Sequence, residues 1–164
     1  MYQNFDEEVQ PGLARERVQA LRRALKAQKL NGFLVPHSDE HQNEFLPASA
    51  ERLRWLTGFT GSAGAAIVLE QGAALFVDGR YSLQAREQVD NAAFEILTTP
   101  EAKPSQWLAS KLAKGAALGY DSRLHTIREI ERLSETLAKA GIKLEPVTTN
   151  PIDRGGSRRR PLLP

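Results

Sequence analysis

Two short apolar runs in the middle of the chain constrain its fold more than any other feature. Residues 65–69 read Ala-Ala-Ile-Val-Leu, and residues 73–77 read Ala-Ala-Leu-Phe-Val. The connection between them is Glu70-Gln71-Gly72, and a three-residue connection that contains glycine is typical of a β-hairpin. Because nearly every residue of both runs is apolar, the sequence predicts a hairpin whose two arms are mostly buried.

The segment before the hairpin carries helix and strand signals in turn. Apolar residues at helical spacing predict a helix over residues 12–30, which ends at the stop signal Asn31-Gly32. The apolar run 32–35 then predicts a central strand that Pro36 ends. A second, short helix is expected over residues 50–56, with Ser49 as its N-cap.

Helices and strands continue to alternate after the hairpin. The sequence predicts helices over residues 81–89, 105–114 and 126–140 and strands over residues 94–98, 116–120 and 142–147. In the last helix Ile127, Ile130, Leu133 and Leu137 form the apolar stripe. Strands that alternate with helices after an initial hairpin indicate an α/β fold, a mixed sheet of about six strands flanked by helices. We expect one domain over residues 1–153 and a basic tail over residues 154–164.

Composition and charge exclude several classes of protein. The chain has 164 residues, 41% of them hydrophobic, which is enough for a single core. It contains no cysteine, so disulfide frameworks, thiolate zinc sites and cysteine nucleophiles are excluded. The first ten residues do not resemble a signal peptide, and no apolar run approaches the roughly 18 residues that suggest a membrane span. We therefore expect a cytoplasmic protein without a membrane partner.

The basic character of the chain is concentrated at its end. The isoelectric point is about 9.0, but residues 151–164 hold four arginines against one aspartate. An anion-binding module that uses this tail is one alternative for function. Because no aromatic residues are interleaved with the arginines, we expect a solvated tail and no nucleic-acid partner.

Alternating polar residues after the first strand offer a metal-binding alternative. On an extended backbone His37, Asp39 and His41 would face one side, as a site of two histidines and one carboxylate requires. Pro36 and the polar neighbours instead favour a hydrogen-bonded surface loop, where alternation carries little meaning. The sequence thus predicts no metal site here, and a stand-alone metal-binding domain remains the alternative.

The turn after the hairpin contains a second candidate site. Asp78 can cap a following helix by accepting hydrogen bonds from its free amides. Arg80 could alternatively clamp a carboxylate with its planar guanidinium, and Tyr81 could supply an amphipathic contact surface. The turn is thus either a cap or part of an interface or cleft wall.

A glycine-rich loop, with Gly58, Gly61 and Gly64, precedes the hairpin. We expect Gly61 or Gly64 to take a positive φ angle that other residues avoid. The loop leads from a helix into a strand, the reverse of the order in nucleotide-binding motifs, so a phosphate cradle is not expected. Trp55 and Trp107 lie on predicted helices and are interpreted as packing residues.

Four groups of residues together resemble one known family. They are Val35-Pro36-His37, then residues 39–45 (Asp-Glu-His-Gln-Asn-Glu-Phe), then Thr57-Gly58-Phe59 with residues 61–64, and finally residues 78–81 with Leu83-Gln84-Ala85. In this order and spacing they resemble the N-terminal domain of Xaa-Pro aminopeptidases (aminopeptidase P), in the creatinase/prolidase group. The resemblance covers residues 11–153 and implies a sheet of ribonuclease-H-like topology.

The resemblance implies a function for a longer protein rather than for this chain alone. Family members remove the N-terminal residue from peptides whose second residue is proline, with a dinuclear metal centre, commonly manganese, in a C-terminal "pita-bread" domain. Beyond Asn150 this chain offers only Asp153 of the ligand types, and the family's continuation is replaced by residues 155–161. We therefore expect a non-catalytic domain with no cofactor and no catalytic or metal-binding residues, and the catalytic domain absent.

In the family such domains mediate subunit association and shape the active-site cleft. The resemblance therefore implies a homo-oligomer, or the missing catalytic domain, as partner, and proline-containing peptides only for a full-length relative. The candidate interface or cleft-wall residues are His41, Asp78, Arg80 and Tyr81.

Overall fold

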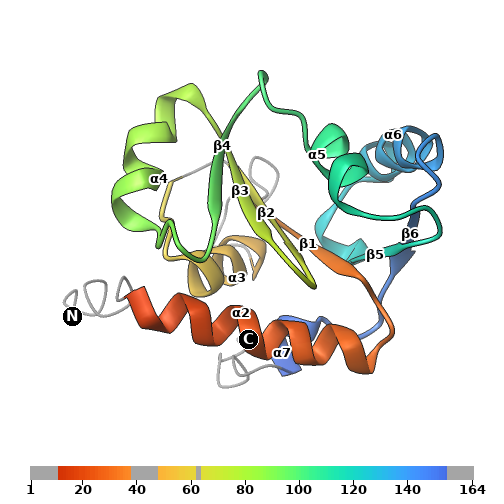
Figure 1. Ribbon diagram of the computed structural model, residues 1–164, viewed down its shortest axis with the longest axis horizontal. Helices are drawn as coiled ribbons and strands as arrows, with labels where there is room; N and C mark the ends of the chain where they lie inside the picture. Colours follow the sequence, from red (N-terminus) through yellow and green to blue (C-terminus); the bar gives the residue numbers. More distant parts are fainter. Residues whose placement is uncertain (1–10, 38–47, 62–63, 155–164) are drawn as a thin grey trace.

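A six-stranded mixed sheet forms the centre of the protein in the computed structural model, which describes residues 11–37, 48–61 and 64–154 (Figure 1). The strands are β1 (Gly32–His37), β2 (Gly64–Leu69), β3 (Ala73–Asp78), β4 (Glu95–Thr99), β5 (Ala117–Tyr120) and β6 (Lys143–Pro146). Their order is β4-β3-β2-β1-β5-β6, with β2 antiparallel to both neighbours and every other pair parallel. Five strands therefore run in one direction and end at the same edge. The expected mixed sheet of about six strands, with β1 central, is confirmed.

Helices cover both faces of this sheet (Figure 1). They are α2 (Pro11–Ala27), α3 (Ala48–Thr57), α4 (Ser82–Gln88), α5 (Pro104–Lys111), α6 (Ile127–Ala138) and α7 (Pro151–Arg154), with short 3₁₀ helices η1 (Gly79–Tyr81) and η2 (Ser122–Leu124). Buried side chains of α2, α3, α4 and α7 pack on one face, and Leu108 of α5 and Leu137 of α6 pack on the other. The result is a three-layer α/β arrangement.

The predicted hairpin is formed by β2 and β3, and alternate residues of each arm fill the two cores. Val68 and Leu75 belong to the cluster beneath α2, whereas Ile67 and Phe76 belong to the cluster beneath α5 and α6. All four side chains are at most 3% exposed. Because successive side chains of a strand point to opposite faces, only a strand covered on both faces is apolar at every position. Coverage on both faces therefore explains why both runs are apolar at nearly every position.

Arg22 fastens the hairpin turn to helix α2. Its Nε donates to the carbonyl of Leu69 at 2.7 Å, and its Nη2 donates to the carbonyl of Gly72 at 3.1 Å. Both acceptors lie at the turn, so one planar guanidinium joins the ends of two strands to the helix that covers them.

Strand β1 continues past the residue that was expected to end it. Pro36 lies inside the strand and pairs with Ala65 of β2. On the other side of β1, the parallel partner β5 pairs only with Gly32 and Phe33. At Pro36 the strand thus has a neighbour on one side only, and there a missing N–H is tolerated.

Three local expectations were wrong. Ser49 lies within α3, which begins at Ala48, so Ser49 is not the N-cap. Ile127 is 78% exposed and does not join the apolar stripe of α6. Thr126 caps the helix directly before it, so Ile127 lies in the first turn and projects into solvent. No helix was predicted after the strand 142–147, but residues 151–154 form the short helix α7, whose Ile152 is fully buried.

Gly64 takes a positive φ of 158°, as expected for Gly61 or Gly64, and Gly58 of the same glycine-rich segment takes one as well. Gly58 has φ 84°, and its N–H closes α3 by donating to the carbonyl of Arg54. Gly61 has no positive φ; instead, a β-carbon there would collide with the ring of Phe59, which is 1% exposed. Gly61 is therefore required by packing rather than by backbone conformation.

We predict that Gly61→Ala destabilises the domain by about 1–3 kcal/mol, because the new methyl group must displace a buried aromatic ring. Gly79→Ala is the matched control, since a β-carbon at Gly79 meets nothing within 4 Å and its φ is not positive. Urea denaturation of both variants measures the difference. Equal midpoints for Gly61→Ala and Gly79→Ala would contradict the packing explanation.

Candidate functional site

The carboxyl ends of the parallel strands gather several polar residues at one edge of the sheet. Asp78 is the last residue of β3, Asp121 directly follows β5, and His37 is the last residue of β1. Because these strands run in the same direction, all three residues lie at the same edge. Strands β2 and β1 separate β3 from β5, which places Asp78 and Asp121 about 14 Å apart at the usual spacing of strands.

Asp78 and Arg80 form a compact turn at the end of β3. One oxygen of Asp78, Oδ1, accepts from the backbone N–H of Arg80 at 2.9 Å and so caps η1. The Arg80 guanidinium donates to both carboxylate oxygens of Asp78, at 3.3 and 2.8 Å. These side-chain hydrogen bonds hold the pKa of Asp78 below its usual value. The expected cap is confirmed, and the carboxylate that Arg80 clamps belongs to its own turn.

The turn packs against the glycine-rich loop and helix α4. The guanidinium carbon of Arg80 lies 5.1 Å from the centre of the Tyr81 ring, and Tyr81 meets Phe59 edge to face at 6.1 Å. Beside them, Thr60 of the loop donates its backbone N–H to the Gln88 side chain of α4 at 2.9 Å. Two segments far apart in the sequence thus form one rigid surface.

We call this the Arg80 surface: Thr60, Asp78, Arg80, Tyr81 and Leu83. The Arg80 side chain is 72% exposed, and Leu83 is 69% exposed. Arginine is enriched at contact surfaces between proteins, and Leu83 adds exposed apolar area to the same surface.

The structure brings together three of the four candidate interface residues. Asp78, Arg80 and Tyr81 belong to the Arg80 surface, whereas His41 lies outside the described residues, as does Asp39 of the alternative metal site. Within the described ranges, no group of three or more histidine, aspartate or glutamate side chains could hold a metal ion. The described part of the chain therefore does not fit the dinuclear metal centre that the resemblance implies.

Sequence reasoning missed a second polar cluster at the same edge. Asp121 is 1% exposed, accepts from the backbone N–H and guanidinium of Arg123, and accepts from Asn150 Nδ2 at 3.0 Å. Burial alone would raise the pKa of Asp121, but the hydrogen bonds from Arg123 and Asn150 outweigh burial and hold it below its usual value. Asn150 also accepts from the N–H of Ile152, so this cluster fixes the start of α7.

His125 completes this cluster, which we call the Asp121 cluster: Asp121, Arg123, His125 and Asn150. The His125 side chain is 6% exposed, and its ring meets the Tyr120 ring edge to face at 5.8 Å. Nδ1 lies 3.6 Å from a carboxylate oxygen of Glu129, while no described residue hydrogen-bonds the buried Nε2. Burial lowers the pKa of His125, and the nearby charges of Glu129 and Asp121 oppose that effect only in part.

A signal for the second cluster is present in the sequence. Asp78-Gly79-Arg80 and Asp121-Ser122-Arg123 share the spacing aspartate, any residue, arginine, and each follows a predicted strand. In both, the aspartate caps a 3₁₀ helix and binds the arginine two residues later. Comparing the two segments would have indicated the second turn, but not its burial by Asn150.

The chain is similar to known proteins over most of its length. A model of the creatinase/prolidase N-terminal domain matches residues 17–154. A probable Xaa-Pro aminopeptidase P of Blastomyces gilchristii is 38% identical over 151 residues, which are 91% of this chain and 24% of the relative. The chain thus spans about a quarter of the length of the curated relatives that it matches.

Solved structures show the same fold. X-prolyl aminopeptidase of Caenorhabditis elegans, a cytosolic enzyme with a di-nuclear active site, superposes with a TM-score of 0.79 and 28% identity over 92% of this chain and 26% of that one. The N-terminal domain of cytoplasmic peptidase PepQ of Mycobacterium tuberculosis has a TM-score of 0.66 and 24% identity, over 85% of this chain and 97% of that domain. In the described part of this chain, no helix has the length and apolarity to cross a membrane.

We predict that Asp121→Ala lowers the free energy of unfolding by about 2 kcal/mol or more, because it leaves the buried amide of Asn150 without its acceptor. Asp78→Ala is the matched control, since it breaks the same kind of turn at a half-buried carboxylate that is 34% exposed, and we expect a smaller loss. Denaturant unfolding compares the two variants. A larger loss for Asp78→Ala would refute a stabilising role of the buried cluster.

A second prediction concerns pH. The pKa of His125 is lower in the fold than its usual value, so below about pH 6.5 the unfolded chain takes up this proton more readily. Stability is therefore lost as the pH falls from about 7 towards the folded pKa, and His125→Gln should lose less over that interval.

Glu129→Gln serves as the second variant for this prediction. It removes a charge that raises the pKa of His125, so acid should destabilise it more than the parent. Chemical denaturation at several pH values gives the free energy of unfolding as a function of pH for each variant. An unchanged slope in His125→Gln would show that His125 does not carry the effect.

Proposed function

The chain belongs to the creatinase/prolidase N-terminal domain family, and we propose that it is the non-catalytic N-terminal domain of an Xaa-Pro aminopeptidase-like metallopeptidase. The observation that carries the proposal is the match over nearly the whole chain to about a quarter of a named Xaa-Pro aminopeptidase P. Under this proposal residues 1–153 form the domain and residues 154–164 a basic tail, with the catalytic domain outside this chain.

The metal chemistry is assigned to that other domain. Hydrolysis at a dinuclear centre needs several carboxylate or imidazole ligands, and the described residues of this chain hold no such group. We propose that the full-length protein carries two metal ions, which the family resemblance implies are manganese, and acts on peptides whose second residue is proline. A cytoplasmic location fits the cytosolic C. elegans relative.

For the domain itself we propose a role in subunit association and in shaping the cleft. The Arg80 surface supports this role. Its Asp78–Arg80 pair and the Tyr81–Phe59 contact hold the turn in place without a partner. A surface that is already ordered loses little conformational entropy on association. Leu83 then offers apolar area next to a positive charge.

We predict that the purified chain shows no turnover of an Xaa-Pro peptide, with or without manganese, and that it self-associates through the Arg80 surface. Leu83→Asp should weaken association because it places a charge in the apolar part of the contact. Ile127→Asp is the matched control: Ile127 is similarly exposed, on α6. Light scattering over a concentration series and a peptidase assay on the same samples provide the measurements.

The two parts of this prediction fail separately. Metal-dependent turnover that persists through purification and is lost on mutation of this chain would overturn the non-catalytic role. A strict monomer at high concentration, or equal weakening by Leu83→Asp and Ile127→Asp, would remove the association role of the Arg80 surface.

A further inference from the structure

Two adjoining hollows lie at the edge of the sheet opposite the Arg80 surface, where β1 and β5 begin and β2 turns into β3. One has a volume of about 420 Å³ and the other about 380 Å³, and both are lined by Asn31 and Glu70. Because they share these residues, they form one continuous depression. We call it the basic groove.

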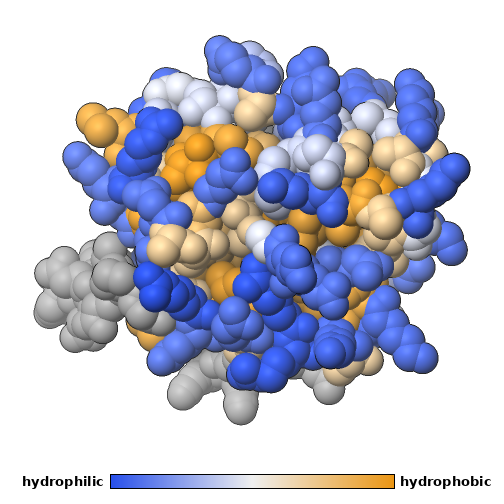
Figure 2. Space-filling view, viewed as in Figure 1, coloured by the Kyte–Doolittle hydropathy of each residue, from blue (hydrophilic) through white to orange (hydrophobic). Residues whose placement is uncertain are grey.

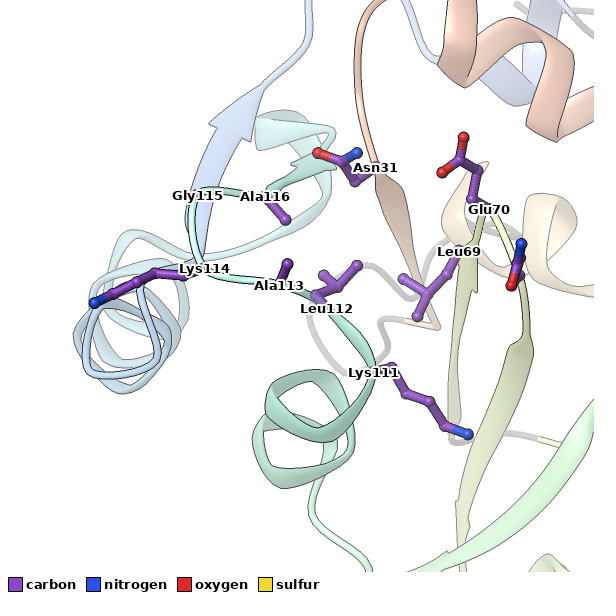
Figure 3. A pocket seen from close by; sticks show the side chains of 10 residues that line it. Asn31, Leu69, Glu70, Lys111, Leu112, Ala113, Lys114, Gly115 and Ala116 are labelled. Carbon is purple, nitrogen blue, oxygen red and sulfur yellow. The ribbon is translucent and has the colours of Figure 1, made fainter.

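The first hollow runs between the hairpin turn and the segment that joins α5 to β5 (Figure 3). Leu112, Ala113 and Ala116 lie along this joining segment, and Leu69 and Glu70 stand opposite. Lys111 extends along the hollow at one end, while Lys114 points outward to the rim (Figure 3). The walls are thus largely small or aliphatic, with ammonium groups at the borders.

Helix α2 forms the wall of the second hollow. Its basic side chains and those of the turn after it line the depression: Arg22, Arg23, Lys26 and Lys29. Arg22 is committed to the carbonyls of Leu69 and Gly72. Arg23, Lys26 and Lys29 are exposed, and among the described residues none of them forms an ion pair. Hydrophilic side chains cover the part of the surface that α2 occupies (Figure 2).

Charge is segregated between the groove and the rest of the domain. Residues 1–150 contain 18 basic and 19 acidic residues. The groove takes six of the basic residues and one acidic residue, Glu70. The remainder of residues 1–150 therefore has a net charge of −6, although the stretch as a whole is nearly neutral. A concave surface of one sign against an oppositely charged body concentrates anions at that surface.

We propose that the basic groove binds an acidic segment of a polypeptide. The groove is open and elongated, and its exposed cations lie on long side chains along α2 and the turn after it, which suits a row of carboxylates better than one compact phosphate group. Its lining residues include no aromatic side chain. Proteins that bind single-stranded nucleic acid stack its bases on such side chains, so a nucleic acid fits less well.

Asn31 supplies the contact to the peptide backbone. Its Oδ1 accepts from the N–H of Ala117 at 2.8 Å, which fixes the side chain and leaves its amide nitrogen directed away from Ala116 (Figure 3). That nitrogen can donate to a carbonyl of a peptide in the groove. The groove lies at the opposite edge from the Arg80 surface, so the inference does not depend on the proposed function.

The test is fluorescence anisotropy of the full chain with a labelled peptide of alternating glutamate and alanine, at low and at physiological ionic strength. The triple variant Arg23→Glu, Lys26→Glu, Lys29→Glu should raise the Kd at least about tenfold, because it reverses the charge of one wall. The matched control is Lys103→Glu, Arg132→Glu, Lys143→Glu. It makes the same charge change at exposed sites outside the groove and should leave the Kd within about threefold.

Each outcome decides the proposal. The basic tail is present in both triple variants, so its contribution to anion binding cancels in the comparison. Equal losses in the two variants, or no measurable binding by the parent chain, would overturn the proposal. Tighter binding of a labelled oligothymidylate than of the peptide, lost in the groove variant, would assign the groove to nucleic acid instead. Circular dichroism confirms that both variants are folded.

Discussion

The pairing of β1 with a different partner on each side is the interaction on which the rest of the structure depends. Strand β1 joins the hairpin, through the antiparallel β2, to the parallel pair β5 and β6. Its junction with β5 is short, and Asn31 extends it by exchanging two hydrogen bonds of 2.8 Å with the backbone of Ala117. Gly119 in β5 leaves room there for the side chain of Leu30. Without this junction the two halves of the sheet would share only their covering helices.

This arrangement separates two surfaces of different chemistry. The strands that run parallel to β1 end at one edge, which carries the Arg80 surface and the Asp121 cluster. The opposite edge holds the hairpin turn and the start of β5, and with α2 it forms the basic groove. Because Arg22 binds the turn while its neighbour Arg23 remains exposed, one stretch of α2 both stabilises the core and supplies charge to the groove.

The two aspartate–arginine turns show how burial changes the role of one local motif. Asp78 and Asp121 make the same hydrogen bonds to the arginine two residues ahead. Asp78 remains accessible, so its turn presents Arg80 and Tyr81 at the surface. Asp121 is covered by Asn150 and the start of α7, so its turn anchors the end of the domain. The motif determines the turn, and the contacts made by distant residues determine its use.

The sequence by itself determined the elements whose signals are local and strong. The hairpin, the alternation of helices and strands and the Asp78 cap were predicted because apolar periodicity and capping act over a few residues. Only the tertiary structure determined that Pro36 stays within a strand, that Gly61 must lack a side chain and that Ile127 is exposed. The β1–β5 pairing ends before Pro36, the ring of Phe59 fills the space beside Gly61, and Ile127 stays exposed in the first turn of α6. The basic groove likewise combines residues from α2, the hairpin turn and the end of α5, which the chain separates and only the folded sheet brings together.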